Sequence, residues 1–116
     1  MIVDDEEMYA RALGEMVGES GHVADIAFEP SEALASALSE DYDVVLADLA
    51  MPGMSGLELA RAIRKDKPDL PIILLTGWAD FLDEKDAEAG GVNLVLAKPV
   101  SFDDLSAAIA ECLNGR

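Results

Sequence analysis

The chain has 116 residues, of which 51% are hydrophobic, which suffices for one domain with its own hydrophobic core. Its formal net charge of −16 argues against nucleic acid as a direct partner, because a phosphate backbone repels an acidic surface. The single cysteine, Cys112, excludes an internal disulfide framework, and its helical spacing with apolar residues predicts a core thiol. Without a secretory signal or a membrane-spanning apolar run, we expect one cytoplasmic domain over residues 1–116.

Short apolar runs alternate with stretches of helical spacing along the whole chain. The apolar runs predict strands at 2–3, 23–28, 44–47, 72–75 and 94–97, of which 23–28 reads as an edge strand. A predicted helix follows each strand, and the one within 79–89 has a poor apolar stripe. This alternation predicts a doubly wound α/β domain, in which right-handed crossovers join parallel strands.

Serines mark the starts of three predicted helices. Ser31 is expected to cap the second helix, and Ser101 to cap the last one. Ser55 and Glu58 have the Ser-x-x-Glu spacing of a capping box, which predicts that the third helix starts there.

Four predicted strands end in polar residues directly after an apolar run. These residues are Asp4 with Asp5, then Asp48, Thr76 and Lys98. Parallel strands place all these endings at one edge of the sheet, where open α/β proteins bind their ligands. Clustered carboxylates repel one another unless a cation lies between them, and an oxygen-only ligand set suits Mg²⁺. Because no histidine or cysteine lies near these strand ends, a zinc site is excluded.

An aspartate in such a site can act as a nucleophile and form an acyl phosphate. Mg²⁺ and Lys98 would neutralise the transferred group, and the Thr76 hydroxyl would donate a hydrogen bond to it. Each residue taken alone has an ordinary explanation as a helix cap, a turn residue or a solvated side chain. Their convergence on one edge favours Mg²⁺-dependent phosphorylation of a carboxylate, with Asp48 as the acceptor.

These residues resemble the receiver domain of two-component response regulators. That family has an acidic pair after the first strand, an acceptor in a D-x-x-M-P-G-M-x-G turn, Thr or Ser after strand four and Lys-Pro after strand five. Here the corresponding residues are Asp4-Asp5, Asp48 to Gly56, Thr76 and Lys98-Pro99. The resemblance covers the whole chain and implies a flavodoxin-like (βα)5 fold, with a five-stranded parallel sheet in the order 2-1-3-4-5.

The resemblance also implies the role of each site residue. Asp48 would accept a phosphoryl group from a phosphohistidine of a histidine kinase or histidine phosphotransfer protein, and Thr76 and Lys98 would bind that group. The implied Mg²⁺ ligands are Asp5, Asp48 and the backbone carbonyl of Ala50, with Asp4 acting mainly through water. The peptide bond before Pro99 would be cis. Such a domain is a regulatory switch rather than an enzyme, although it catalyses its own phosphorylation and dephosphorylation.

Three features depart from the family's pattern. Val95 stands where the family usually has an aromatic switch residue, which puts the usual Thr–aromatic relay in doubt. Ala50 and Trp78 stand at positions that tune acyl-phosphate hydrolysis, and since neither orients a water we expect slow self-dephosphorylation; the alternative is that Trp78 is only a rim residue. The first strand is several residues shorter than in the family, so we expect it to be truncated at its N-terminus.

Other functions share part of this pattern. A small Mg²⁺-dependent phosphatase with an Asp nucleophile usually has a second Asp where this chain has Ala50, and it carries a cap for which the chain has no room. A pseudo-receiver that binds partners without phosphorylation is disfavoured by the intact set of acids, Thr76 and Lys98. A flavin-binding domain needs a phosphate loop after the first strand, where this chain has four acids instead.

The wider context of the domain is open at this point. His22, the only histidine, is expected to be a surface residue rather than a phosphodonor. The chain is either a stand-alone regulator or a domain of a larger protein, and residues 75–80 are similar to receivers of hybrid sensor kinases. A homodimer remains open as a further partnership.

Overall fold

The computed structural model describes residues 1–77 and 84–114, along which five strands alternate with five helices. The strands are β1 (Ile2–Val3), β2 (Ile26–Ala27), β3 (Val45–Asp48), β4 (Ile72–Thr76) and β5 (Leu94–Ala97). The helices are α1 (Glu7–Glu19), α2 (Pro30–Ser39), α3 (Gly56–Asp66), α4 (Glu84–Ala89) and α5 (Phe102–Asn114). All neighbouring strands are parallel in the order β2-β1-β3-β4-β5, which confirms the predicted fold class and strand order.

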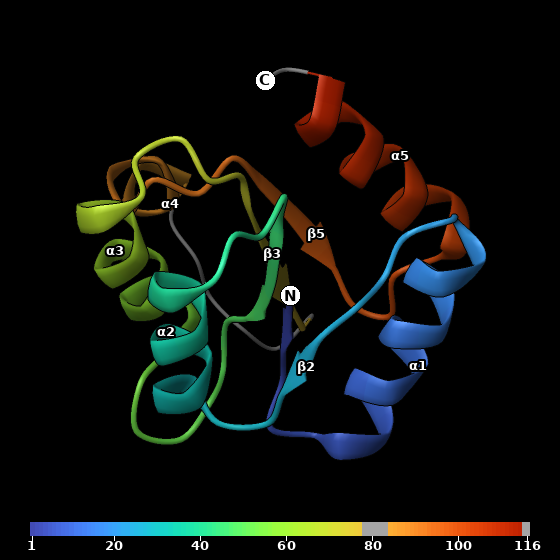
Figure 1. Ribbon diagram of the computed structural model, residues 1–116, viewed down its shortest axis with the longest axis horizontal. Coiled ribbons are helices and arrows are strands. Elements are labelled where there is room, and N and C mark those ends of the chain that lie inside the picture. The colour runs from blue at the N-terminus through green and yellow to red at the C-terminus, as the bar shows by residue number, and fades with distance from the viewer. Residues whose placement is uncertain (78–83, 115–116) are drawn as a thin grey trace.

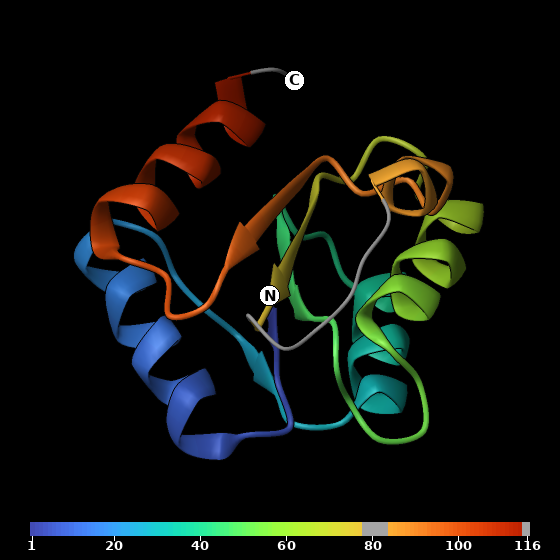
Figure 2. The ribbon, with the colours of Figure 1, turned by 180° about the vertical axis from the view of Figure 1, so that it is seen from behind.

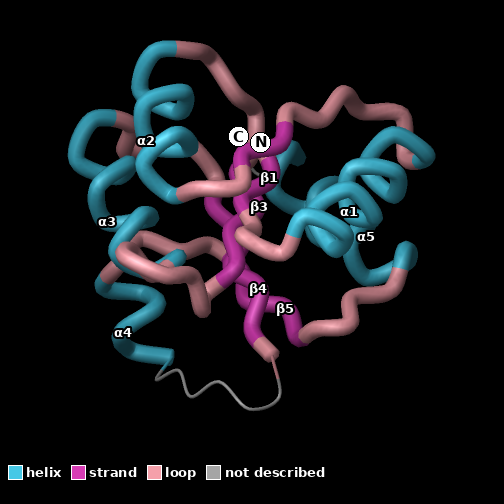
Figure 3. The backbone as a smooth tube through the Cα atoms, turned by 90° about the horizontal axis from the view of Figure 1, so that it is seen from below, coloured by secondary structure: helices cyan, strands magenta, loops and turns pink. Residues whose placement is uncertain are grey.

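The sheet lies between two layers of helices. Helices α1 and α5 cover one face, and α2, α3 and α4 lie on the other (Figure 1, Figure 2). Seen from below, the strands form a central row between these layers (Figure 3). On β3, Leu46 packs into the cluster under α1 and α5, while Val45 and Ala47 pack into the cluster under α2 and α3. Strand β3 is therefore buried on both faces, as its apolar sequence predicted.

The boundaries of two predicted elements differ from the structure. The strand predicted over 23–28 pairs with β1 only at Ile26–Ala27, at the edge of the sheet. Helix α2 begins at Pro30 after Glu29, so Ser31 lies inside the first turn and the prediction that it caps the helix is wrong. Proline suits this first turn because the N–H that it lacks would have no partner there.

The other two predicted helix caps are confirmed. At α3, the Glu58 N–H donates to Ser55 Oγ at 3.2 Å and the Ser55 N–H donates to Glu58 Oε1 at 3.3 Å. At α5, Ser101 Oγ accepts a hydrogen bond from the Asp104 N–H at 3.1 Å. These caps fix where the helices after β3 and β5 begin.

The single cysteine and the single histidine lie where the sequence predicted. Cys112 is buried on α5, as predicted, and burial raises the pKa of its thiol. His22 is exposed in the segment between α1 and β2, also as predicted. Within residues 1–77 and 84–114, no helix combines the length and the apolar character needed to cross a bilayer.

A glycine allows α3 to start directly against the end of β3. The Gly56 N–H donates to the carbonyl oxygen of Leu49 at 2.9 Å. A Cβ atom on Gly56 would overlap the carbonyl oxygen of Asp48 and would lie 2.8 Å from Leu74 Cδ1. The contact between α3 and the end of β3 therefore requires glycine at this position.

Replacing Gly56 with alanine is expected to destabilise the protein by about 1–3 kcal/mol, the usual cost of forcing an extra carbon into a packed interior. The measurement is the free energy of unfolding in urea at pH 7. Gly18→Ala is the matched control, because Gly18 lies within α1 and a Cβ there would have no atom within 4 Å. This control should be at least as stable as the wild type. A Gly56→Ala variant of wild-type stability would contradict the prediction.

Candidate functional site

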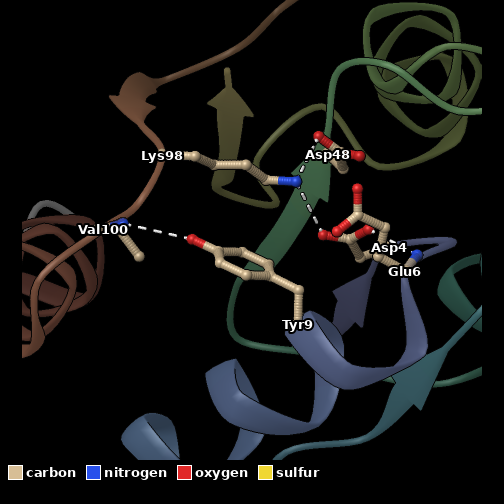
Figure 4. Close-up of polar contacts among 6 residues, drawn as sticks. All are labelled: Asp4, Glu6, Tyr9, Asp48, Lys98 and Val100. Atoms are coloured by element: carbon tan, nitrogen blue, oxygen red, sulfur yellow. Dashed lines mark hydrogen bonds and ion pairs between the residues drawn. The ribbon is translucent and has the colours of Figure 1, made fainter. Parts of the chain in front are cut away.

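The carboxyl edge of the sheet holds a lysine between two buried carboxylates (Figure 4). Lys98 Nζ lies 3.1 Å from Asp4 Oδ2 and 3.0 Å from Asp48 Oδ1. Lys98 directly follows β5, Asp4 directly follows β1, and Asp48 is the last residue of β3. Asp4 is 0% and Asp48 4% exposed, and they are the two buried charged residues in the described part of the chain. Three segments far apart in the sequence thus form one ion-paired cluster.

Burial and charge pairing together set the pKa values in this cluster. Burial raises the pKa of the Asp48 carboxyl; the hydrogen bond from Lys98 lowers it, and the charges of Asp4 and Asp5 raise it further. Burial alone would lower the pKa of the Lys98 ammonium, but its hydrogen bonds to Asp48 and Asp4 outweigh burial and raise it. Lys98 is therefore protonated at neutral pH and offsets the repulsion between the carboxylates.

Asp4 is held in place by both of its oxygens. Its Oδ1 accepts a hydrogen bond from the Glu6 N–H at 2.9 Å, just before α1 begins, while Oδ2 faces Lys98. Its backbone N–H donates to the carbonyl of Ala27 on β2 at 3.2 Å. Asp4 therefore links the start of α1 to the lysine.

Asp5 adds a third carboxylate and is exposed. One oxygen each from Asp4, Asp5 and Asp48 lie within 4.8 Å of one another. Mg²⁺ is bound in proteins by one or two carboxylates with water completing its shell, so this cluster offers the kind of ligands that the ion uses. The oxygen-only donor set also suits Mg²⁺ better than zinc. Ala50, whose carbonyl is the remaining predicted ligand, is exposed two residues after β3.

Thr76 lies at the same edge as the ion pair, at the end of β4. It pairs with Ala97 in the ladder, and its carbonyl oxygen accepts a hydrogen bond from the Lys98 N–H at 2.7 Å. The peptide bond between Lys98 and Pro99 is cis, as the sequence comparison with receivers implied. The structure thus gathers the predicted residues of all four strand ends along one edge of the sheet.

Sequence reasoning missed one residue of this site. Helical spacing with Leu13 and Val17 places Tyr9 on the apolar side of α1, yet its ring centroid lies 4.5 Å from Lys98 Nζ. Its hydroxyl oxygen also accepts a hydrogen bond from the Val100 N–H at 3.3 Å (Figure 4). The sequence does contain a signal, because Tyr9 carries a polar hydroxyl on an aromatic ring and lies about one helical turn after the acidic pair. Helical periodicity alone does not distinguish such a residue from a core residue.

Val95 and Trp78 are two of the residues at which the sequence departs from the family's pattern. Val95 lies on β5 and is 43% exposed, so no large aromatic side chain occupies this position. Trp78 lies outside the described residues.

Fold and site together define a class of protein, namely doubly wound (βα)5 domains with an acidic site at the carboxyl edge of the sheet. A family model described as the response regulator receiver domain matches residues 1–110. The chain belongs to this family.

Curated relatives agree with this assignment. The two-component response regulator PhoP of Pseudomonas aeruginosa is 34% identical over 114 residues, which cover 98% of this chain and 51% of the relative. The uncharacterized transcriptional regulatory protein YkoG of Bacillus subtilis is 35% identical over 98% of this chain and 50% of its own length. The chain thus spans about half the length of the curated relatives it matches.

Solved structures also match over nearly the whole chain. A response regulator receiver domain protein from Clostridium thermocellum superposes with a TM-score of 0.91 and 31% identity, covering 98% of this chain and 92% of that one. The response regulator TrrA of Thermotoga maritima, in complex with Mg(2+)-BeF, has a TM-score of 0.89 and 37% identity, covering 97% and 96%. These structures confirm the receiver fold.

Replacing Asp48 with asparagine is expected to stabilise the metal-free protein at pH 7. Because the pKa of Asp48 is raised in the folded state, its ionised form opposes folding at pH values above that pKa. The advantage of the variant should therefore shrink as the pH falls toward about 4, the ordinary carboxyl pKa. The measurement is urea unfolding in EDTA across this pH range.

Asp66→Asn is the control for this experiment, because it removes one negative charge from an exposed position at the end of α3. The difference in unfolding free energy between Asp66→Asn and the wild type should not show the pH dependence expected for Asp48→Asn. A metal-free Asp48→Asn variant that is less stable than the wild type at pH 7 would contradict the expectation.

Proposed function

We propose that Asp48 is the phosphoacceptor of this receiver domain, and that it takes a phosphoryl group from a phosphohistidine of a histidine kinase or histidine phosphotransfer protein. The observation that supports this most directly is the Lys98 ammonium, 3.0 Å from Asp48 Oδ1 in a buried site. A cation placed there stabilises the charge that the phosphoryl oxygens carry during transfer.

The transfer exchanges one bond to phosphorus for another. A carboxylate oxygen of Asp48 forms the new P–O bond while the P–N bond of the phosphohistidine breaks. The electron pair of the broken bond stays on the imidazole nitrogen, which takes up a proton from solvent. Lys98 shifts its hydrogen bond toward a phosphoryl oxygen, and the Thr76 hydroxyl donates to another.

We assign the Mg²⁺ ligands to Asp5, Asp48 and the carbonyl of Ala50, with Asp4 acting through water. This assignment is supported by the three carboxylate oxygens that lie within 4.8 Å of one another. The ion supplies charge neutralisation to the transferred group when it is bound. Asp4, whose two oxygens already contact Glu6 and Lys98, orients the lysine and the water shell rather than the ion itself.

The domain acts as a regulatory switch that catalyses its own phosphorylation and dephosphorylation. Neither a phosphatase nor a pseudo-receiver gains support from the family match. The likeness to TrrA, at 37% identity and solved in complex with Mg(2+)-BeF, supports phosphorylation chemistry in this chain. We further propose that dephosphorylation is slow, because the methyl side chain of Ala50 beside the acceptor cannot orient an attacking water.

Incubation with acetyl phosphate and Mg²⁺ is expected to add one phosphoryl group to the wild type, as measured by intact mass. Asp48→Asn and an EDTA-treated sample should gain none, because they lack the nucleophile and the charge-neutralising ion, respectively. Asp66→Asn, the exposed control, should be phosphorylated like the wild type. A phosphoryl group on the Asp48→Asn variant, or none on any sample, would refute the assignment.

The phosphorylated domain is expected to persist far longer than seconds after the phosphodonor is removed by desalting. Ala50→Asn should shorten this half-life by about tenfold, because an amide next to the acceptor can orient a water molecule. The decay is followed by intact mass over time, with Ala35→Asn as an exposed alanine control on α2. A wild-type half-life of seconds would contradict slow dephosphorylation.

A further inference from the structure

Tyr9 contacts the segment after β5 at two points. The Lys98 ammonium lies over its ring, 4.5 Å from the centroid, within the range of a cation–π interaction. Two residues later, the Val100 N–H donates to the Tyr9 hydroxyl oxygen at 3.3 Å. Figure 4 shows the hydroxyl of Tyr9 directed to Val100 and its ring on the side of the lysine. Tyr9 therefore bridges α1 and the chain that carries Lys98.

We propose that Tyr9 is a positioning residue, which holds the Lys98 ammonium where it can follow the phosphoryl group on Asp48. This inference rests on the proposed phosphoacceptor function. In this role Tyr9 acts through Lys98, which lies over its ring.

The ring gives Lys98 a third partner of a different kind from its two carboxylates. Hydrogen bonds to Asp4 Oδ2 and Asp48 Oδ1 are directional and fix the ammonium at 3.1 Å and 3.0 Å. A ring face attracts a cation over a broad area and imposes no single direction. When the bond to Asp48 is exchanged for one to a phosphoryl oxygen, the ammonium can shift while it keeps its contact with Tyr9.

The hydroxyl and the ring have separable tasks. The hydroxyl bond to Val100 fixes the backbone just beyond Lys98, and Val100 itself is buried in the cluster under α1 and α5. The ring screens one side of the ammonium, and the side chain of Lys98 is only 17% exposed. Excluding water on that side strengthens the attraction between the lysine and the oxygens it faces.

The experiment compares Tyr9→Phe and Tyr9→Leu in phosphorylation by acetyl phosphate at saturating Mg²⁺. Tyr9→Leu removes the ring and should lower the maximal rate about threefold to tenfold. Tyr9→Phe keeps the ring and should restore the rate to within about twofold, even if losing the Val100 partner lowers the melting temperature. Tyr42→Leu is the matched control, because Tyr42 precedes β3 and bonds to Asp25 and Glu40 instead.

A double-mutant cycle separates positioning from a general loss of stability. If Tyr9 acts through Lys98, Tyr9→Leu should cause no further loss of rate when it is added to Lys98→Met. An undiminished loss in that background, a wild-type rate for Tyr9→Leu, or an equal loss in Tyr42→Leu would overturn the proposal.

A second measurement does not depend on phosphorylation and keeps the two proposals distinguishable. In the proton spectrum of the unphosphorylated domain, the ring should shift the Lys98 ε-methylene resonance upfield. This shift should persist in Tyr9→Phe and Tyr42→Leu and disappear in Tyr9→Leu. If the wild type shows the shift but gains no phosphoryl group, the proposed function fails while the placement of Lys98 by Tyr9 stands. If the wild type lacks the shift, the positioning role itself is refuted.

Discussion

The site depends on one lysine that compensates two buried carboxylates. Moving a charged carboxylate out of water costs several kcal/mol, and a buried charge whose partner is removed is strongly destabilising. Asp4 and Asp48, at 0% and 4% exposed, each lie within hydrogen-bond distance of Lys98. The three charges come from the ends of β1, β5 and β3, so the cluster exists only when the parallel sheet has formed. The constraint that assembles the site is therefore also a constraint on the topology of the fold.

The scaffold holds this cluster by close packing on both faces of the sheet. Strand β3 is buried along its whole length, and Gly56 lets α3 start against the carbonyl of Asp48. The backbone N–H of Lys98 is tied to Thr76 at the end of β4. Because rigid strands place the reactive groups, the ammonium meets the carboxylates without ordering a loop first.

Sequence patterns predicted the parts of the fold that local physics determines. Apolar runs identified the buried strands, and the Ser55–Glu58 spacing located the start of α3. The prediction failed at Ser31 because Pro30, with no N–H of its own, suits the first helical position and starts the helix two residues earlier than a Ser31 cap would. Parallel pairing predicted that the strand ends would meet at one edge of the sheet. It did not predict which of their side chains would lie within hydrogen-bond distance of Lys98. Tyr9 was missed because periodicity shows which face of a helix is buried and not which side chain of another element lies against it.

The aromatic contact of the lysine in this chain comes from a helix rather than from its own strand. Val95, three residues before Lys98, carries a small side chain that is 43% exposed, so β5 offers the ammonium no ring. The ring is supplied by Tyr9 on α1, whose hydroxyl also holds the backbone that leads into α5. Under the proposed role of Tyr9, a change of charge at Asp48 alters the balance among the partners of Lys98. The elements that carry those partners are α1 and the segment after β5, and they are where a structural response to phosphorylation would begin.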